Sequence, residues 1–337
     1  MFSVKNFLIV ACCLICCLSA RAADWTQQKS GTLAWLHDVY FVNENKGFIV
    51  GSSGILLLTT DSGKTWRAQE KFTTDTIEQI YFSDENTGWL LCEKSLFERG
   101  ALGSSYLLKT TDGGAHWEQI SFGGGRERIT KIFFAKNNFA MAIGETGVLF
   151  ALQDDAKTWK RMISPTRYLL LDGNFTDEFH GTIVGAGGSV LFTEDAGATW
   201  NQAMLSGDAK TRLNKVFFIN QKLGWTLGSA GKIYQTVNGG KTWHEQKSGV
   251  EENLTDVFFL NTAEGWAVGD DGTILHTTTG GNVWSVVDSK IKHRLEKVFF
   301  SGRKGWAVGF GGTILSFDET KTSNNSQLKP QMRSRRD

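Results

Sequence analysis

The eight residues TTDSGKTW at 59–66 decide the fold, because the same phrase returns along the chain. It reads TTDGGAHW at 110–117, TEDAGATW at 193–200 and TVNGGKTW at 236–243. The tryptophans that close these boxes, and two more divergent ones, are Trp66, Trp117, Trp159, Trp200, Trp243 and Trp284, at spacings of 51, 42, 41, 43 and 41 residues. A period near 42 is typical of a four-stranded propeller blade, which takes about 40–50 residues.

The sequence between two boxes supports this interpretation. Residues 212–246 contain four short runs, LNKVFF, GWTLG, KIYQT and WHEQ, each rich in β-branched or aromatic residues and bounded by turn residues. Sheets of this size cannot bury both faces alone, so we expect them to stack radially around an axis. The predicted fold class is therefore all-β, a β-propeller.

Counting the first-strand segments predicts how the ring closes. Seven of them begin near Trp35, Thr76, Arg128, Arg167, Arg212, Asn253 and Arg294. The last segment is followed by SFDETKTS at 316–323, where Ser323 stands in place of the tryptophan, whereas DWTQQKS at 24–30 matches TWHEQKS at 242–248. We therefore expect one seven-bladed β-propeller over residues 23–323, with the N-terminal strand completing the last blade.

Both ends of the chain are predicted to lie outside this domain. Residues 1–22 carry Lys5, an apolar run at 7–18 and a small-residue site that favours cleavage after Ala22, as in a secretory signal peptide. IVAC at 9–12 leaves a lipid anchor at Cys12 open, although few apolar residues precede it. Residues 324–337 form a basic tail that we expect to be disordered. The location predicted is the periplasm, or a lumen if the source is photosynthetic.

Composition excludes several classes of site. Without residues 1–22 the chain keeps 34 Lys and Arg against 35 Asp and Glu, which is unlike a nucleic-acid binder. Cys92 is then the only cysteine, so neither an internal disulfide nor a CxxC zinc site can form. No cofactor or metal is expected, and the protein is expected to be a monomer. The insertion at 93–104 is predicted to be a surface loop, functional or merely tolerated.

The repeated box itself is predicted to be a structural turn. Its Asp can accept hydrogen bonds from nearby backbone amides, its Gly can take a positive φ, and its Thr adds a hydroxyl. The box varies without losing its place, as turn chemistry tolerates but a catalytic carboxylate or calcium ligand would not. The residues assigned this structural role are Asp61, Asp112, Asp154, Asp195, Asn238 and Asp318.

These motifs also carry a family resemblance. TTDGGAHW, TEDAGATW and GWAVGDDGTIL are similar to the Asp-box (BNR) repeat, and residues 24–320 resemble the photosystem II stability/assembly factor family and its bacterial relatives. The resemblance implies a seven-bladed, non-enzymatic assembly chaperone with a surface arginine patch. The signal is bacterial and no plastid transit peptide precedes the domain, so the binding role carries over but the photosystem partner does not.

One column of the aligned repeats holds the candidate binding site. The first position of the first-strand segments is occupied by Trp35, Arg128, Arg167, Arg212 and Arg294, so four of nine arginines in the propeller body share it. Since first strands line the channel, these side chains are expected at one rim, with Arg126 and Arg161 extending the patch. Lys131, Lys215 and Lys297 follow rim arginines by three residues and are predicted to point to the other face.

Arginine and tryptophan dominate binding hot spots, and guanidinium groups suit carboxylates. We therefore expect a secreted binding propeller, an assembly chaperone or accessory factor whose partner is a polypeptide segment of a membrane protein complex. Peripheral association with a membrane stays open, as does pairing of the arginines with neighbouring blades. The alternative is an Asp-box glycan-binding protein or sialidase-like hydrolase, but the Phe-Arg-Ile-Pro start of sialidases is absent, and Tyr168 is the only tyrosine beside the column.

Overall fold

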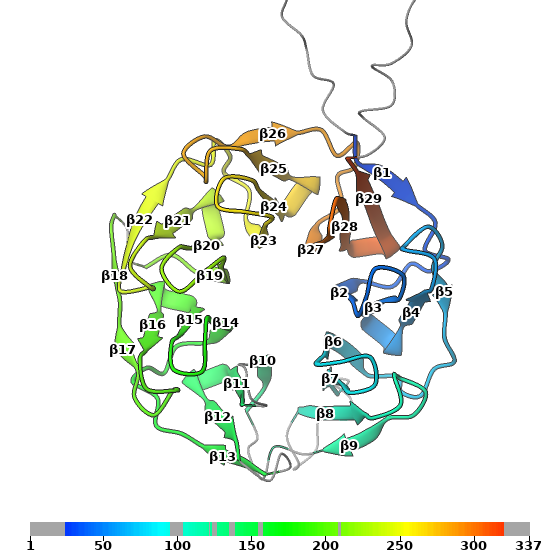
Figure 1. Cartoon of the computed structure of the whole chain (residues 1–337), viewed down its shortest axis with the longest axis horizontal. Helices are drawn as coiled ribbons and strands as arrows, with labels where there is room; N and C mark the ends of the chain where they lie inside the picture. Colours follow the sequence, from blue (N-terminus) through cyan, green and yellow to red (C-terminus); the bar gives the residue numbers. More distant parts are fainter. Residues whose placement is uncertain are drawn as a thin grey trace, which may run out of the picture.

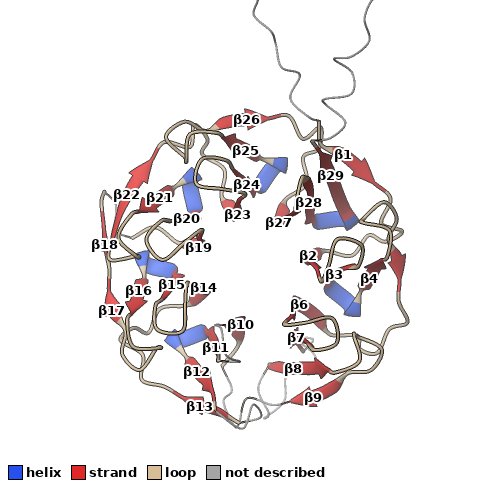
Figure 2. Ribbon diagram, in the orientation of Figure 1, coloured by secondary structure: helices blue, strands red, loops and turns tan. Residues whose placement is uncertain are grey.

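Seven small sheets surround a central channel, as Figures 1 and 2 show, so the prediction of a seven-bladed β-propeller is confirmed. The computed structural model describes residues 24–94, 104–120, 122, 127–134, 139–153, 158–207 and 210–319. Within this described part, no helix is long and apolar enough to span a membrane. Asp154, Arg126, residues 1–23 and residues 320–337 fall outside the described ranges, as does most of the 93–104 insertion.

Each blade is an antiparallel meander that runs outward from the channel. Blade 1 comprises β2 (Leu36–Phe41), β3 (Gly47–Gly51), β4 (Leu56–Thr59) and β5 (Arg67–Ala68). Blade 2 comprises β6 (Thr76–Phe82), β7 (Gly88–Glu93), β8 (Ser105–Thr110) and β9 (Glu118–Ile120). Blade 3 comprises β10 (Ile129–Phe134), β11 (Ala140–Gly144), β12 (Leu149–Leu152) and β13 (Trp159–Arg161). Blade 4 comprises β14 (Leu170–Phe175), β15 (Gly181–Gly185), β16 (Val190–Thr193) and β17 (Asn201–Gln202).

Blades 5 to 7 repeat the pattern. Blade 5 comprises β19 (Leu213–Phe218), β20 (Gly224–Gly228), β21 (Ile233–Thr236) and β22 (Thr242–Gln246), with β18 (Met204–Leu205) added in parallel to β22. Blade 6 comprises β23 (Leu254–Phe259), β24 (Gly265–Gly269), β25 (Ile274–Thr277) and β26 (Ser285–Val287). Blade 7 comprises β27 (Leu295–Ser301), β28 (Lys304–Gly309), β29 (Thr313–Asp318) and β1 (Thr26–Gln28). Short 3-10 turns follow the second strands: η1 (Ser52–Gly54), η3 (Glu145–Gly147), η4 (Ala186–Gly188), η5 (Ser229–Gly231), η6 (Asp270–Gly272) and η7 (Phe310–Gly312).

The N-terminal strand closes the ring as predicted. β1 pairs antiparallel with β29, with Thr26 opposite Ser316, and the two strands lie side by side in Figure 1. Trp25 is 2% exposed and packs edge-on against Trp266 of blade 6 at 5.6 Å between ring centroids. The first strand of the chain therefore completes the sheet that its last strands begin.

The hydrophobic core lies between the blades. Trp306 of blade 7 stacks on Phe41 of blade 1 at 4.0 Å between ring centroids, and Trp225 of blade 5 stacks on Phe259 of blade 6 at 3.4 Å. Box tryptophans such as Trp66 add edge-on contacts to the same layers. Since each blade buries both faces against its neighbours, the aromatic residues of every repeat have the same role.

The box forms the turn that its residues predict. In blade 4, Asp195 Oδ1 accepts a hydrogen bond from Thr199 N at 2.8 Å, and its Oδ2 accepts one from the Thr199 hydroxyl at 2.6 Å. These bonds hold the pKa of Asp195 below its usual value. Asn238 in blade 5 makes the equivalent pair, because its Oδ1 accepts from Thr242 N and its Nδ2 donates to the Thr242 hydroxyl.

This equivalence gives a first test of the structural assignment. Asp195→Asn is expected to change the free energy of unfolding by less than about 0.5 kcal/mol, because the amide can make both contacts that Asn238 makes. Asp195→Ala loses both bonds and is expected to cost roughly 1–2 kcal/mol. Denaturant melts of the three proteins measure this, and partner binding lost in a stably folded Asn variant would contradict the assignment.

Every inner strand carries a bulge near its start. The register shifts after Leu36, Ile77, Ile129, Leu170, Leu213, Leu254 and Leu295. A bulge adds one residue to the strand and so reverses the alternation of side chains beyond it. The prediction that Lys131, Lys215 and Lys297 point to the face opposite the rim arginines is therefore wrong, and all three line the channel.

Candidate functional site

The backbone defines which residues form the channel rim. The carbonyls of Trp35, Arg128, Leu169, Arg212, Asn253 and Arg294 each accept a hydrogen bond from the first residue of the following 3-10 turn. Thr76 stands at the same place in blade 2, one residue before buried Ile77. Trp35, Arg128, Arg212 and Arg294 therefore share one rim.

Arg167 does not belong to this column. Leu169 occupies the equivalent place in blade 4, and Arg167 precedes it by two residues in an exposed loop. Blade 4 reads RYLLLDGNF and lacks the aromatic pair that ends the other first strands, so the sequence places its arginine in the column instead of Leu169. Counting back from Phe175, the equivalent of Phe218, would have found Leu169. Arg161 is also off the rim, because it ends the outer strand β13 and pairs with Glu127 at 2.7 Å.

Two of the rim arginines, Arg128 and Arg294, already pair with carboxylates of the chain. Arg128 Nε donates to Glu93, and its Nη2 lies 3.2 Å from Glu78 Oε1. Burial opposes the charge of Arg128, but Glu93 and Glu78 hold its pKa above the usual value. Arg128 is therefore paired with carboxylates of the neighbouring blade.

Arg294 has the same kind of surroundings. Its Nη1 lies 2.9 Å from Asp270 Oδ1, and its Nε lies 2.6 Å from Glu296 Oε1. Burial again opposes the charge, and Glu296 and Asp270 keep the pKa of Arg294 raised. Arg128 and Arg294 are therefore held in place at opposite blades of the rim with part of their charge compensated.

Arg212 differs from the other two. It is exposed, and the polar contact that its side chain makes within the described residues is Nε to Asn214 Oδ1 at 3.0 Å. Burial, and then the charges of Arg294 and Arg128, lower the pKa of Arg212 below its usual value. No carboxylate of the described part of the chain pairs with this guanidinium. Arg212 is therefore free to donate hydrogen bonds to a carboxylate of a ligand.

Trp35 anchors an aromatic cluster at the same rim. Its ring stacks on His37 at 5.4 Å between centroids, meets Phe310 edge-on at 5.6 Å, and lies 6.0 Å from the guanidinium carbon of Arg294. Phe310 is 51% exposed. Phe310 is not among the candidate binding residues that the sequence predicts. The signal is present there, because GFGG at 309–312 places a phenylalanine where the other turns begin with Ser, Glu, Ala or Asp.

Just inside the rim, a belt of charged side chains lines the channel. The residue that follows each bulge occupies it, in blade order Asp38, Gln79, Lys131, Asp172, Lys215, Asp256 and Lys297. Lys215 Nζ lies 3.2 Å from Asp172 and 3.5 Å from Asp256. Burial by itself would raise the pKa of Asp172, but Lys215 and Lys131 hold it below the usual value. The lysines and aspartates alternate around the ring.

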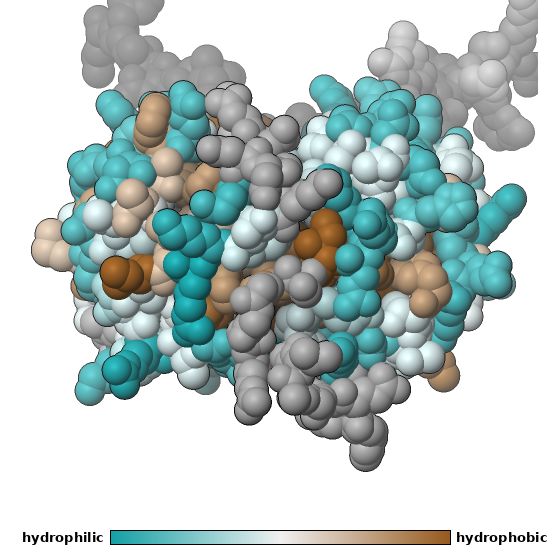
Figure 3. Space-filling view, turned by 90° about the horizontal axis from the view of Figure 1, so that it is seen from below, coloured by the Kyte–Doolittle hydropathy of each residue, from teal (hydrophilic) through white to brown (hydrophobic). Residues whose placement is uncertain are grey.

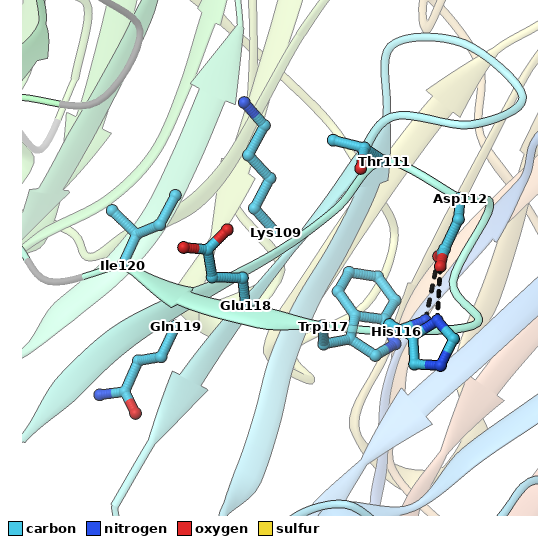
Figure 4. Close-up of a pocket in the computed structure, with 8 residues that line it drawn as sticks. All are labelled: Lys109, Thr111, Asp112, His116, Trp117, Glu118, Gln119 and Ile120. Carbon is cyan, nitrogen blue, oxygen red and sulfur yellow. Dashed lines mark hydrogen bonds and ion pairs between the residues drawn. The ribbon is translucent and has the colours of Figure 1, made fainter.

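A hollow of a different kind lies on the outer side of blade 2, shown in Figure 4. Its box carries His116 in place of threonine, and His116 Nδ1 lies 2.7 Å from Asp112 Oδ2. The other lining side chains, such as Lys109 and Glu118, do not converge on one point in that view. We therefore interpret this hollow as a consequence of the variant box turn, not as a catalytic or binding site.

The outer wall adds no broad apolar surface on the side drawn in Figure 3. The coloured residues there are mostly hydrophilic, and the hydrophobic ones form small separate groups. Among the described residues, no group of three or more His, Cys, Asp or Glu could hold a metal ion. The rim and the channel behind it are thus where charged and aromatic side chains gather.

Solved structures share this architecture. One described as YCF48 bound to D1 peptide has a TM-score of 0.72 at 21% identity, over 88% of this chain and 97% of that chain. YCF48 from Cyanidioschyzon merolae gives 0.72 at 20% identity, over 88% and 100%. Virginiamycin B lyase from Staphylococcus aureus gives 0.73 at 11% identity, over 88% and 99%. At these identities the likenesses show the fold alone.

Two curated relatives match shorter segments. Photosystem II assembly lipoprotein Ycf48 of Synechococcus sp. (strain CC9902) is 34% identical over 87 residues, which is 25% of this chain and 26% of that protein. The protein of the same name from Synechocystis sp. (strain ATCC 27184 / PCC 6803 / Kazusa) is 28% identical over 108 residues, 31% and 32% of the two chains. The matched segments thus span about a quarter to a third of these relatives' length.

The family model described as photosynthesis system II assembly factor YCF48 matches residues 18–96, 151–248 and 242–334. These matches cover well over half of the 337 residues and include six of the seven inner strands. The chain therefore belongs to the photosynthesis system II assembly factor YCF48 family.

Proposed function

We propose that this protein is an exported, non-enzymatic binding propeller that holds an acidic polypeptide segment of a membrane protein while its complex assembles. The observation that carries the proposal is Arg212, an exposed guanidinium without a carboxylate partner among the described residues, at the same rim as the cluster of Trp35 and Phe310. A carboxylate of the ligand would pair with Arg212, and an apolar side chain would cover the aromatic cluster.

The comparisons support a polypeptide ligand. Both curated relatives are named as photosystem II assembly lipoproteins, and one solved YCF48 structure is described as bound to D1 peptide. In this chain Arg128 and Arg294 are compensated by carboxylates, so their part is to fix the shape and potential of the rim. Arg167 and Arg161 lie off the rim and are left out, and Arg126 lies outside the described residues.

Charge reversal at Arg212 tests the proposal. Arg212→Glu is expected to weaken binding of a fluorescent acidic peptide by at least about tenfold, because a charge-assisted pair is replaced by repulsion. The matched control is Arg303→Glu, the same charge change at a side chain that is 72% exposed on the β27–β28 turn. Fluorescence anisotropy measures both, and equal weakening by the two variants would show that only net charge matters.

Trp35→Ala separates burial from charge. Binding by the unmodified protein should weaken as salt rises, because exposed charges are screened within about 10 Å at 0.1 M ionic strength. The contribution of Trp35 is apolar, so its removal should weaken binding by a similar factor at low and high salt. If Trp35→Ala weakens binding at low salt but not at high salt, the indole acts instead by orienting the Arg294 guanidinium.

The enzyme alternative has a direct test. Tyr168 is 59% exposed in the loop before β14, beside the off-rim Arg167. A sialidase needs a tyrosine nucleophile with acidic partners, and we propose that this chain does not act as one. No turnover of a fluorogenic sialoside is expected, whereas turnover abolished by Arg212→Ala would establish a hydrolase.

The location is also a proposal. Residues 1–22 would direct export across the inner membrane, and the lipoprotein names of the relatives make Cys12 an anchor to test against cleavage after Ala22. Intact mass of the protein purified from membranes distinguishes the two. The domain limits of 23–323, the basic tail at 324–337 and the monomeric state remain predictions.

A further inference from the structure

The charged belt of the channel, separate from the rim site, departs from its own pattern at one place. Seven positions cannot alternate between two charges, and the belt holds three lysines, three aspartates and Gln79. Lys215 and Lys297 each lie between two aspartates, at 3.2 to 3.8 Å. Lys131 lies between Gln79 and Asp172, with Asp172 Oδ1 3.8 Å from its Nζ.

Gln79 cannot take the place of the missing carboxylate. Its Nε2 donates to Ile132 O at 2.7 Å, and its Oε1 accepts from Ile132 N at 2.9 Å. Both ends of the amide are thus used to join blade 2 to blade 3. Within the part of the chain that the structure describes, the Lys131 ammonium has one long contact to a carboxylate, although it can donate three hydrogen bonds.

The next layer of the channel departs from its pattern beside the same lysine. Two residues beyond the belt, each inner strand has an aromatic residue except in blade 4: Tyr40, Tyr81, Phe133, Asn174, Phe217, Phe258 and Phe299. Asn174 belongs to the blade next to Lys131, and no hydrogen bond joins its amide to the described residues. Gly173 stands where the other inner strands have Val or Ile. The ring of Phe133 fills the space of the missing side chain, because a Cβ on Gly173 would lie 2.5 Å from the ring atoms.

These departures meet in one cavity. A channel cavity of about 240 Å³ is lined by the belt residues other than Asp256, by Asn174 and by aromatic rings. The Lys131 side chain is 19% exposed, so solutes can reach it. The cavity could hold a few water-sized groups, each taking about 30 Å³, but not a folded peptide element.

We propose that the channel binds a small monovalent anion, a halide or a short carboxylate, at Lys131, on the side of the belt where Gln79 replaces a carboxylate. The anion would complete the alternation of charges around Lys131, and the Asn174 amide lines the same cavity as a further donor. An ammonium and an amide are the donors that such an anion needs.

Bromide provides a probe that the unmodified protein can report. Crystals soaked in sodium bromide are expected to show an anomalous peak in contact with Lys131 Nζ. Peaks confined to surface lysines, or an empty channel at the highest tolerated bromide concentration, would overturn the proposal. This measurement needs no variant, so it stands whatever a substitution does to folding.

Variants extend the test to solution. Bromide line broadening in NMR is expected for the unmodified protein and for Lys160→Gln, an exposed control on β13. Lys131→Gln should weaken the affinity at least about tenfold, because it removes the charge-assisted bond. Equal affinity in Lys131→Gln, with circular dichroism showing a folded chain, would overturn the proposal.

Competition identifies the kind of anion. Acetate that displaces bromide would extend the site to short carboxylates, and bromide retained against acetate would restrict it to halides. Dextran sulfate, a polymer, is too large to enter a cavity of about 240 Å³ and is expected not to compete at equal ionic strength. Displacement of bromide by dextran sulfate as readily as by acetate would show screening rather than a site.

The affinity should also depend on pH. Asp38 of β2, Asp172 of β14, Lys215 of β19 and Lys297 of β27 act on Lys131. Burial, and then Lys215, lower its pKa to about 8 against the pull of Asp172. Because only the protonated amine attracts an anion, bromide affinity is expected to fall as pH rises above about 8. An affinity that is constant from pH 7 to 10 would overturn the assignment to Lys131.

Discussion

Deletion of residues 24–30 is expected to lower the free energy of unfolding by at least about 3–5 kcal/mol, the cost of truncating one buried tryptophan. Trp25 packs among Trp266, Phe300 and Phe317, and β1 pairs with β29. The deletion also exposes the edge of β29. It removes Gln28 as well, which accepts a hydrogen bond from Trp66 Nε1 and donates to Gly63 O of blade 1.

Two substitutions divide this effect. Trp25→Ala removes the buried ring but keeps the strand, and should show most of the loss. Leu33→Ala is the control, at a side chain that is 88% exposed just after the deleted segment, and should change stability by less than about 0.5 kcal/mol. Denaturant unfolding followed by tryptophan fluorescence measures all three, and an unchanged midpoint after the deletion would show that the ring is closed by the last blade's other strands alone.

Asp256→Ala is expected to cost about 3–5 kcal/mol, although it touches no apolar contact, because removing one partner leaves two lysines in the channel without their shared carboxylate. Asp256 is 2% exposed and lies 3.5 Å from Lys215 Nζ and 3.6 Å from Lys297 Nζ. Its Oδ2 also accepts a hydrogen bond from Val298 N of blade 7 at 2.9 Å. The belt thus fastens each blade to the next.

The Asn variant separates charge from hydrogen bonding. Asp256→Asn keeps an acceptor for Val298 N and should lose less stability than the alanine variant. Glu251→Ala, on an exposed loop residue, serves as the control and should have little effect. If Asp256→Ala melts like the control, the belt ion pairs are screened by channel water and do not stabilise the ring.

The sequence alone was enough for the architecture. The box period, the run pattern and the match between DWTQQKS and TWHEQKS predicted seven blades and their closure, because each repeat must bury the same aromatic residues against its neighbours. These signals are local and are repeated seven times, so an error in one repeat is corrected by the others. The alignment failed in blade 4, where Asn174 interrupts the aromatic pair that ends the other first strands, so Arg167 stood in the column in place of Leu169.

Which residues meet around the channel was decided only by the tertiary structure. The third letters of LHDVYF, IEQIYF, ITKIFF, LLDGNF, LNKVFF, LTDVFF and LEKVFF spell the belt in the printed sequence, but strict alternation places them on the wrong face. The bulge that turns them inward is a shift in the backbone pairing between the first two strands of each blade, and the side-chain pattern does not reveal it. Likewise, Glu296 is the one of these carboxylate partners that lies close in sequence to its arginine. Glu78 and Glu93 reach Arg128 from the preceding blade, and Asp270 reaches Arg294 in the same way, so only the tertiary structure tells which arginine is paired.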